Sequence, residues 1–215
     1  MFIGDRVVVR YRLGPGAPGD WRGADGATLS DVTGVILDAG DPLILTRAAP
    51  AAVASDDRVR IPAELVSAVR LLPYRAVRNR EIRDVALRAV EAVETGEIAG
   101  WRVRLGIPPD DPHPVSTAVP ARLGARLDAA TESALQQWFA PRGLPPIIEL
   151  PERLVAGAAI GVAVGGEFHR LVRVAGDGTE STIVTVSADD VPRGTALRAD
   201  GYALHHRVTY RQLGP

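Results

Sequence analysis

The sequence predicts an α+β protein in which a small all-β barrel precedes a separate domain of mixed helices and strands. A length of 215 residues suits two modest domains better than one large one. Up to Leu72, short runs of alternating apolar and polar residues recur between turn residues, which is typical of strands. After Pro73, helical and extended patterns alternate, which indicates a domain with both helices and strands.

Residues 1–72 are expected to form a five-stranded, SH3-like β-barrel. The predicted strands cover residues 3–13, 32–38, 43–47, 58–61 and 68–72. In the first strand Val7, Val9 and Tyr11 share one face. A long polar loop follows this strand, and a helical turn begun by Pro62 precedes the last one. Aromatic residues are scarce, so we expect a structural or docking module that could bind a protein partner.

Residues 73–99 are predicted to be a connector followed by a helix. The connector begins at Pro73 and is basic, and Asn79 can cap the helix behind it. Apolar residues recur at helical spacing from Ile82 to Val93, and Gly96 ends the run.

Residues 100–215 are predicted to form the mixed domain itself. The predicted strands cover residues 101–105, 147–150, 168–174, 182–186 and 206–211. The predicted helices cover about residues 128–141, 154–164 and 192–198. Asp177 and Gly178 are expected to form a hairpin turn.

Composition excludes several kinds of function. There are no cysteines, which excludes disulfides, thiolate zinc sites and cysteine nucleophiles. All 25 basic residues are arginine, which fits a GC-rich bacterial genome and excludes a lysine base or Schiff base. The net charge of −1 and the few aromatic residues argue against nucleic-acid binding. No apolar run is long enough for a membrane span and no signal peptide is evident, so we expect a cytoplasmic protein.

Two pairs of potential metal ligands are better explained without a metal. His205 and His206 are adjacent on a predicted strand, so their side chains are expected to point to opposite faces. Asp189 and Asp190 precede a predicted helix, and an N-cap explains them. We therefore expect no metal site.

Four segments, taken in their order, carry a resemblance to a known family. Residues 73–83, Gly100 to Arg104, residues 137–146 and residues 201–211 resemble GNAT-family N-acetyltransferases of high-GC bacteria that carry an N-terminal SH3-like barrel. The resemblance implies that residues 100–215 are a shortened GNAT-like mixed α/β domain. It also implies transfer of an acetyl group from acetyl-CoA to an amine, with a base or water taking the proton.

The resemblance implies a particular cofactor site. The pyrophosphate of acetyl-CoA would rest on backbone N–H groups of an Arg/Gln-x-x-Gly-x-Gly/Ala turn that opens a helix after a central strand. That helix N-terminus would point into the gap between two diverging parallel strands. No such turn occurs between Val164 and Val184, where we would expect it.

The candidate cofactor residues lie further along the chain. Arg193, Gly194 and Thr195 echo a glycine-rich turn of the family. At other family positions, Asp190 replaces an asparagine that commonly contacts the cofactor, and Leu197 replaces an aromatic residue, often a tyrosine, that protonates the thiolate. Tyr202 matches the family's Gly-aromatic corner.

Three functions remain open at this stage, and no catalytic residue is assigned. The first is a catalytically degenerate relative of acetyltransferases that has lost its acetyl-CoA site. The second is an active N-acetyltransferase whose cofactor turn lies near Arg193 to Thr195. The third is a non-enzymatic protein-interaction or assembly module, with a homodimer as one expected form.

Overall fold

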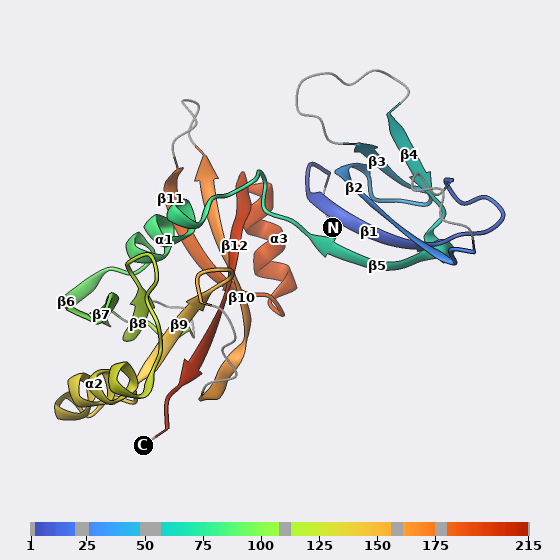
Figure 1. Ribbon diagram of the computed structural model, residues 1–215. Coiled ribbons are helices and arrows are strands. Elements are labelled where there is room, and N and C mark those ends of the chain that lie inside the picture. Colours follow the sequence, from blue (N-terminus) through green and yellow to red (C-terminus); the bar gives the residue numbers. More distant parts are fainter. Residues whose placement is uncertain are drawn as a thin grey trace. The chain divides into compact units, whose positions relative to one another are not determined.

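The computed structural model describes residues 3–19, 26–47, 57–107, 113–155, 161–174 and 180–214. The chain divides into two compact units, Met1–Arg75 and Ala76–Pro215. The predicted α+β class is confirmed, because a five-stranded antiparallel sheet is followed by a mixed seven-stranded sheet and, among the described residues, three α-helices (Figure 1). None of the helices described is both long and apolar enough to cross a bilayer.

The first unit is an antiparallel sheet with strand order β4-β3-β2-β1-β5. Its strands are β1 (Arg6–Arg12), β2 (Leu29–Asp38), β3 (Leu43–Arg47), β4 (Arg58–Ile61) and β5 (Val66–Leu71), with a 3₁₀ turn, η1 (Ala63–Leu65), before β5. These strands lie close to the predicted positions, because each combines a period-two apolar pattern with turn residues at its ends.

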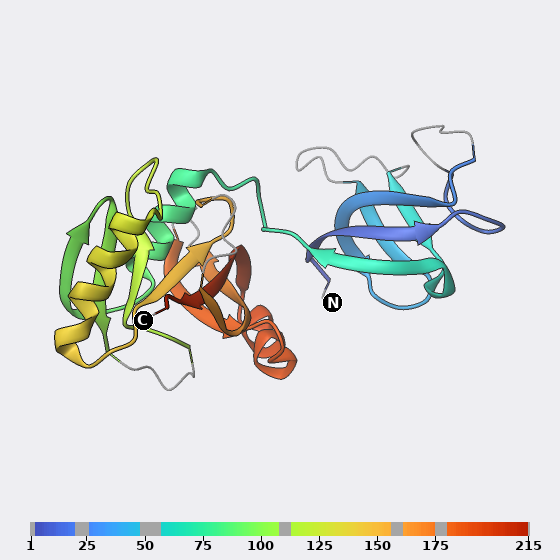
Figure 2. The ribbon, with the colours of Figure 1, turned by 60° about the horizontal axis from the view of Figure 1, so that its bottom comes forward.

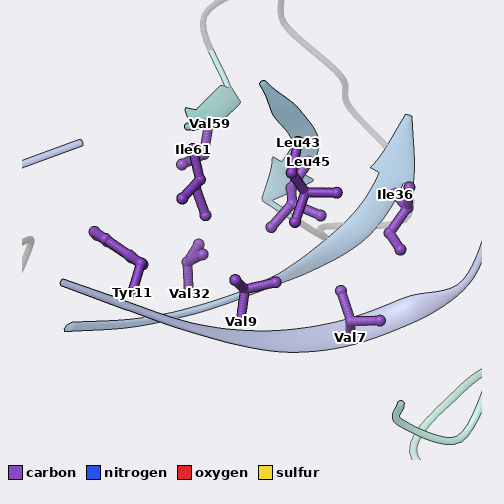
Figure 3. Packing of buried hydrophobic residues seen from close by; sticks show 9 residues of the cluster. All are labelled: Val7, Val9, Tyr11, Val32, Ile36, Leu43, Leu45, Val59 and Ile61. Atoms are coloured by element: carbon purple, nitrogen blue, oxygen red, sulfur yellow. The ribbon is translucent and has the colours of Figure 1, made fainter. Parts of the chain in front are cut away.

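The core of the first unit is built by the predicted face of β1. Val7, Val9 and Tyr11 are each 1% exposed or less. Figure 3 shows them converging with inward side chains of the other strands, namely Val32, Ile36, Leu43, Leu45, Val59 and Ile61. Burial of each aliphatic side chain contributes about 1.5–3 kcal/mol, so this cluster is the main source of stability for the sheet.

The second unit is a mixed sheet with strand order β11-β10-β12-β9-β8-β7-β6. Its strands are β6 (Ala92–Ile98), β7 (Trp101–Gly106), β8 (Thr117–Pro120), β9 (Ile147–Pro151), β10 (Val162–Val174), β11 (Glu180–Ser187) and β12 (Tyr202–Gln212). Its helices are α1 (Asn79–Arg88), α2 (Ala129–Phe139) and α3 (Val191–Ala199), with a 3₁₀ turn, η2 (Ala140–Arg142), after α2.

The strands of this sheet pair antiparallel except for β8 and β9, which are parallel. Strand β12 lies between β9 and β10, although it follows both in the sequence (Figure 1). The predicted hairpin of β10 and β11 is antiparallel, with Leu171 opposite Val184, while its predicted turn at Asp177 and Gly178 lies outside the described residues.

The prediction that the first helix continues to Val93 is wrong. The helix ends at Arg88, and Ala92–Ile98 is strand β6, which pairs with β7. Ala99 and Gly100 both have positive φ, 47° and 84°, and they form the tight turn between these strands. Pairing with β7 satisfies the backbone of this segment and outweighs the helical spacing of its apolar residues.

The prediction of a helix over residues 154–164 is also wrong for those residues of this range that the structure describes. Residues 152–155 form a turn, and Val162 and Val164 belong to β10, opposite Gln212 and Tyr210 of β12. Gly161 has a φ of 72°, which does not fit a helix interior. Residues 156–160 lie outside the described part of the chain.

The two faces of the second sheet carry different helices. Leu135 and Phe139 of α2 pack against Trp101, Val103 and Ile148 of the strands, and Figure 2 shows α2, in yellow, lying along them. Side chains alternate along a strand, so the neighbours of Val103 and Ile148 face the opposite side. That side is covered by α1, which contacts β8 and β9 and buries residues 82, 85 and 86.

Candidate functional site

The predicted cofactor residues Arg193, Gly194 and Thr195 are the third to fifth residues of α3. Asp190 is the N-cap, and one oxygen of its carboxylate accepts a hydrogen bond from the backbone N–H of Arg193 at 3.1 Å. The backbone N–H of Gly194 donates to the Asp190 carbonyl oxygen at 2.9 Å. The hydroxyl of Thr195 donates to the Val191 carbonyl oxygen at 2.6 Å. The start of this helix therefore already holds a carboxylate of the chain.

The other two residues at family positions lie away from the start of α3. Leu197 is half-buried in α3, and Tyr202 lies past the opposite end of the helix, at the start of β12. The guanidinium of Arg173 lies over the ring of Tyr202, 4.6 Å from its centroid. The predicted residues thus fall into two groups, one at each end of α3.

A second helix N-terminus lies between the two parallel strands in the sequence. Strands β8 and β9 are joined through α2, and their pairing is limited to Ala118 opposite Ile148. This is the strand and helix arrangement that the resemblance implies for a cofactor site, and it lies between residues 117 and 151. Sequence reasoning overlooked it because the short strand β8 was not predicted.

The segment between β8 and α2 departs from the cofactor pattern. Residues 121–126 read Ala-Arg-Leu-Gly-Ala-Arg, so only Gly124 matches, while Ala121 and Arg126 stand at the other two specified positions. The backbone N–H groups of Ala121 and Arg122 both donate to the Gly100 carbonyl oxygen, at 2.9 and 3.0 Å. These two donors are therefore used by the chain itself.

Asp128 is the N-cap of α2. Its carboxylate accepts a hydrogen bond from the backbone N–H of Thr131 at 2.8 Å. This bond lowers the pKa of Asp128 below its ordinary value, so the carboxylate is ionised at neutral pH. The positive end of the helix dipole thus faces a negative charge supplied by the protein.

The described residues of the second unit include a buried polar network centred on Glu149 of β9. One Glu149 carboxylate oxygen, Oε2, accepts from Nη2 of Arg104 on β7 at 2.5 Å. The other, Oε1, accepts from Nη2 of Arg170 on β10 at 2.7 Å. The three residues are each 1% exposed or less. Both carboxylate oxygens are therefore engaged in buried ion pairs.

Both guanidiniums bind further groups around the network. Arg104 donates to the Thr117 hydroxyl at 3.1 Å and to the Ala86 carbonyl oxygen of α1 at 3.0 Å. Arg170 donates to the hydroxyl of Thr185 on β11 and to that of Tyr210 on β12 at 3.4 Å. The network thus connects α1 with six neighbouring strands of the sheet, in the order β7, β8, β9, β12, β10 and β11.

The network carries one more positive than negative charge. Two arginines face one glutamate, and arginine stays protonated in proteins. Burial, followed by the charge of Arg170, lowers the pKa of His206 well below its ordinary value. Burial, followed by the charge of Glu149, raises the pKa of Tyr210 above its ordinary value. His206 and Tyr210 are therefore both neutral at pH 7.

A β-bulge in β12 corrects the expectation that His205 and His206 point to opposite faces. Arg170 pairs with His206 but Leu171 pairs with Leu204, so His205 is an additional residue on β12. The two rings meet instead, with their Nδ1 atoms 2.7 Å apart. Among the described residues, no group of three or more histidine, aspartate or glutamate side chains could hold a metal ion.

Sequence reasoning did not single out this network. One signal was available: Glu149 is the only charged residue of the apolar segment Ile147–Pro151, and Arg170 directly precedes Leu171 and Val172. A charge in a central strand is buried and needs a partner. Which partner it finds depends on strand order, which the sequence pattern did not provide.

Comparison with known proteins adds two matches. The model of a family described as "Probable histone acetyltransferase Rv0428c C-terminal" matches residues 77–211. The chain is also 29% identical over 203 residues to the probable histone acetyltransferase Rv0428c of Mycobacterium tuberculosis strain H37Rv. That alignment covers 91% of this chain and 59% of the relative, so the chain spans less than two thirds of the relative's length. No solved structure matches the chain.

Proposed function

The chain belongs to the family described as probable histone acetyltransferase Rv0428c C-terminal, and on this premise we propose that its second unit is a catalytically degenerate acetyltransferase-type domain. The predicted relationship to acetyltransferases is confirmed by this family. Membership of the GNAT family and the loss of the acetyl-CoA site stay predictions. The activity named for the relative belongs to a longer protein, since the alignment covers 59% of it.

The observation that carries the proposal is the aspartate at each candidate helix N-terminus. A pyrophosphate binds at such a position because N–H groups and the helix dipole favour an anion. At α2 the carboxylate of Asp128 already accepts from the N–H of Thr131, and at α3 that of Asp190 accepts from the N–H of Arg193. A pyrophosphate at either helix would have to displace a carboxylate or lie beside its negative charge.

The side chains that would perform the chemistry support the same conclusion. Among the described residues Glu149 is the only buried carboxylate, and a guanidinium donates to each of its oxygens. Leu197 stands where the family often has a tyrosine, and an aliphatic side chain cannot protonate a thiolate. These residues supply neither a free base nor an acid for acetyl transfer.

A binding experiment with the full chain tests the proposal. Acetyl-CoA is titrated into the protein in a calorimeter, and thermal unfolding is followed with and without the ligand. We expect no heat of binding and no change in Tm, because a ligand that does not bind the folded state cannot stabilise it. Saturable binding to the unmodified chain would overturn the proposal. Binding that appears only in Asp128→Asn or Asp190→Asn would support it, because the amide keeps the cap but removes the charge.

The second candidate is an active N-acetyltransferase that holds its cofactor at α3. It is favoured by the position of Arg193, Gly194 and Thr195 near the N-terminus of an α-helix. The test follows acetylation of a lysine-containing histone-tail peptide by mass spectrometry. In this case Gly194→Asp abolishes turnover, while Gly194→Ala retains it, because an added Cβ meets only Arg198 Nη1 at 3.8 Å. Equal turnover in both variants removes this candidate.

A further inference from the structure

A cleft of about 390 Å³ lies on the first unit beside strand β4. It is lined by residues 16–18 of the loop after β1, by Arg47 at the end of β3 and by residues 57–60. All of the described residues that line the cleft belong to the first unit.

The lining of the cleft is positively charged. Its described lining contains three arginines, Arg47, Arg58 and Arg60, and one acidic residue, Asp57. All three arginines are exposed, and within the described part of the chain their guanidiniums make no hydrogen bond or ion pair. By contrast, Arg10 on the same sheet is bound to Asp31 at 2.8 Å. The cleft thus presents guanidinium groups that are available to bind carboxylates or phosphates.

Strand β4 places two of these arginines on the same face of the strand. Val59 and Ile61 point into the core, as Figure 3 shows, so Arg58 and Arg60 point away from it on the opposite face. Among the described strands β4 pairs only with β3 and ends the sheet. An edge strand presents backbone N–H and C=O groups to which another extended segment can pair.

We propose that this cleft binds an extended, acidic segment of a partner protein, which pairs with the edge of β4. Residues two apart on a strand are separated by about 6.6–6.8 Å and share a face. Acidic residues at every second position of the bound segment therefore match the spacing of Arg58 and Arg60. Backbone pairing supplies affinity, and the arginine–carboxylate contacts supply specificity. Arg47 extends the charged surface along the cleft.

The same arginines could attract a nucleic-acid backbone, but two observations favour a peptide. The described residues that line the cleft include no aromatic side chain, and single-stranded nucleic acid is usually held by stacking on aromatic rings. The net charge of the chain is −1, so no wider positive field supports phosphate binding.

The full chain can be tested with labelled peptides. The probe is a synthetic peptide with glutamate at every second position between valines and threonines, and the comparison peptide has glutamine in place of each glutamate. Binding is measured by fluorescence anisotropy at two salt concentrations, and the contact surface is mapped by backbone amide chemical shifts. We expect the acidic peptide to shift the amides of residues 57–60 and to bind more weakly at high salt.

Charge reversal distinguishes this cleft from general electrostatic attraction. Arg58→Glu with Arg60→Glu is expected to weaken binding of the acidic peptide at least tenfold. Arg70→Glu is the matched control, because Arg70 is exposed on β5 of the same sheet and does not line the cleft. Equal loss in the control, unchanged affinity in the double variant, or tighter binding of a single-stranded oligonucleotide would each overturn the proposal. Amide shifts outside the cleft serve as the check that the double variant is folded.

Discussion

Glu149 is the residue on which the centre of the second sheet depends. Replacement by glutamine keeps the shape of the side chain but leaves Arg104 and Arg170 buried without an opposite charge. Removing one partner of a buried ion pair typically costs about 3–5 kcal/mol, and here two cations lose the same partner. We therefore predict that Glu149→Gln lowers the free energy of unfolding by at least about 3 kcal/mol, measured by urea denaturation.

An exposed ion pair provides the control for this prediction. Glu94 on β6 binds Arg142, and its side chain is 44% exposed. Glu94→Gln should change the free energy of unfolding much less, because water screens and replaces an exposed pair. Similar losses in the two variants would contradict the role assigned to the buried network.

At the scale of single residues, prediction from sequence succeeded where the periodicity of apolar residues determines which side chains are buried. Val7, Val9 and Tyr11 were predicted on one face and are buried together. Arg104 and Glu149 are separated by 45 positions, and Arg170 follows Glu149 by 21. Their contact arises from which strands are neighbours, and no local pattern contains that information.

At the scale of elements, the bulge in β12 creates a pH-sensitive position. It places His206 against His205 and Arg170 in the interior, and burial lowers the pKa of His206. The unfolded chain, with a histidine pKa of about 6.5, then binds a proton that the folded chain does not. We predict that stability falls as pH drops below about 6.5, measured as Tm between pH 7.5 and 5.5. The lowered pKa of His169, also caused mainly by burial, acts in the same direction.

The contribution of His206 can be isolated by substitution. His206→Gln should flatten the dependence of Tm on pH, whatever its effect on Tm at pH 7.5, because glutamine does not titrate. The same exchange at the half-buried His113 is the control for loss of an imidazole. An unchanged slope in His206→Gln would show that other groups cause the acid sensitivity.

The prediction of helices and strands failed where the spacing of apolar residues fits a helix but the chain forms a strand. Residues 89–93 fit the helical period of α1, yet the chain leaves the helix at Arg88 and continues as β6. The turn at Ala99 and Gly100 returns the chain to pair with β7, and this pairing lies outside any local window. The short strand β8 was missed for the related reason that four residues show too little periodicity. Because α2 follows β8, the candidate cofactor helix was missed with it.

At the scale of the whole molecule, the two units have separate cores. The core of the first unit is formed by residues between Val7 and Ile61, and the cores of the second by residues from Trp101 onward. We predict that Leu45→Ala destabilises the first unit by about 2–5 kcal/mol, and that Phe139→Ala destabilises the second by about 3–5 kcal/mol. Hydrogen exchange of backbone amides should report each loss within its own unit. Equal acceleration of exchange in both units by either variant would contradict separate cores.

The position of β12 affects how the second unit is made on the ribosome. Translation delivers β9 and β10 first, but these strands do not pair with each other, and β12 fills the place between them. Until β12 emerges, each of the two strands has an uncovered edge, and nothing yet joins the strand of Arg170 to that of Glu149. A polypeptide that stalls before Tyr202 therefore exposes two strands able to pair with other nascent chains.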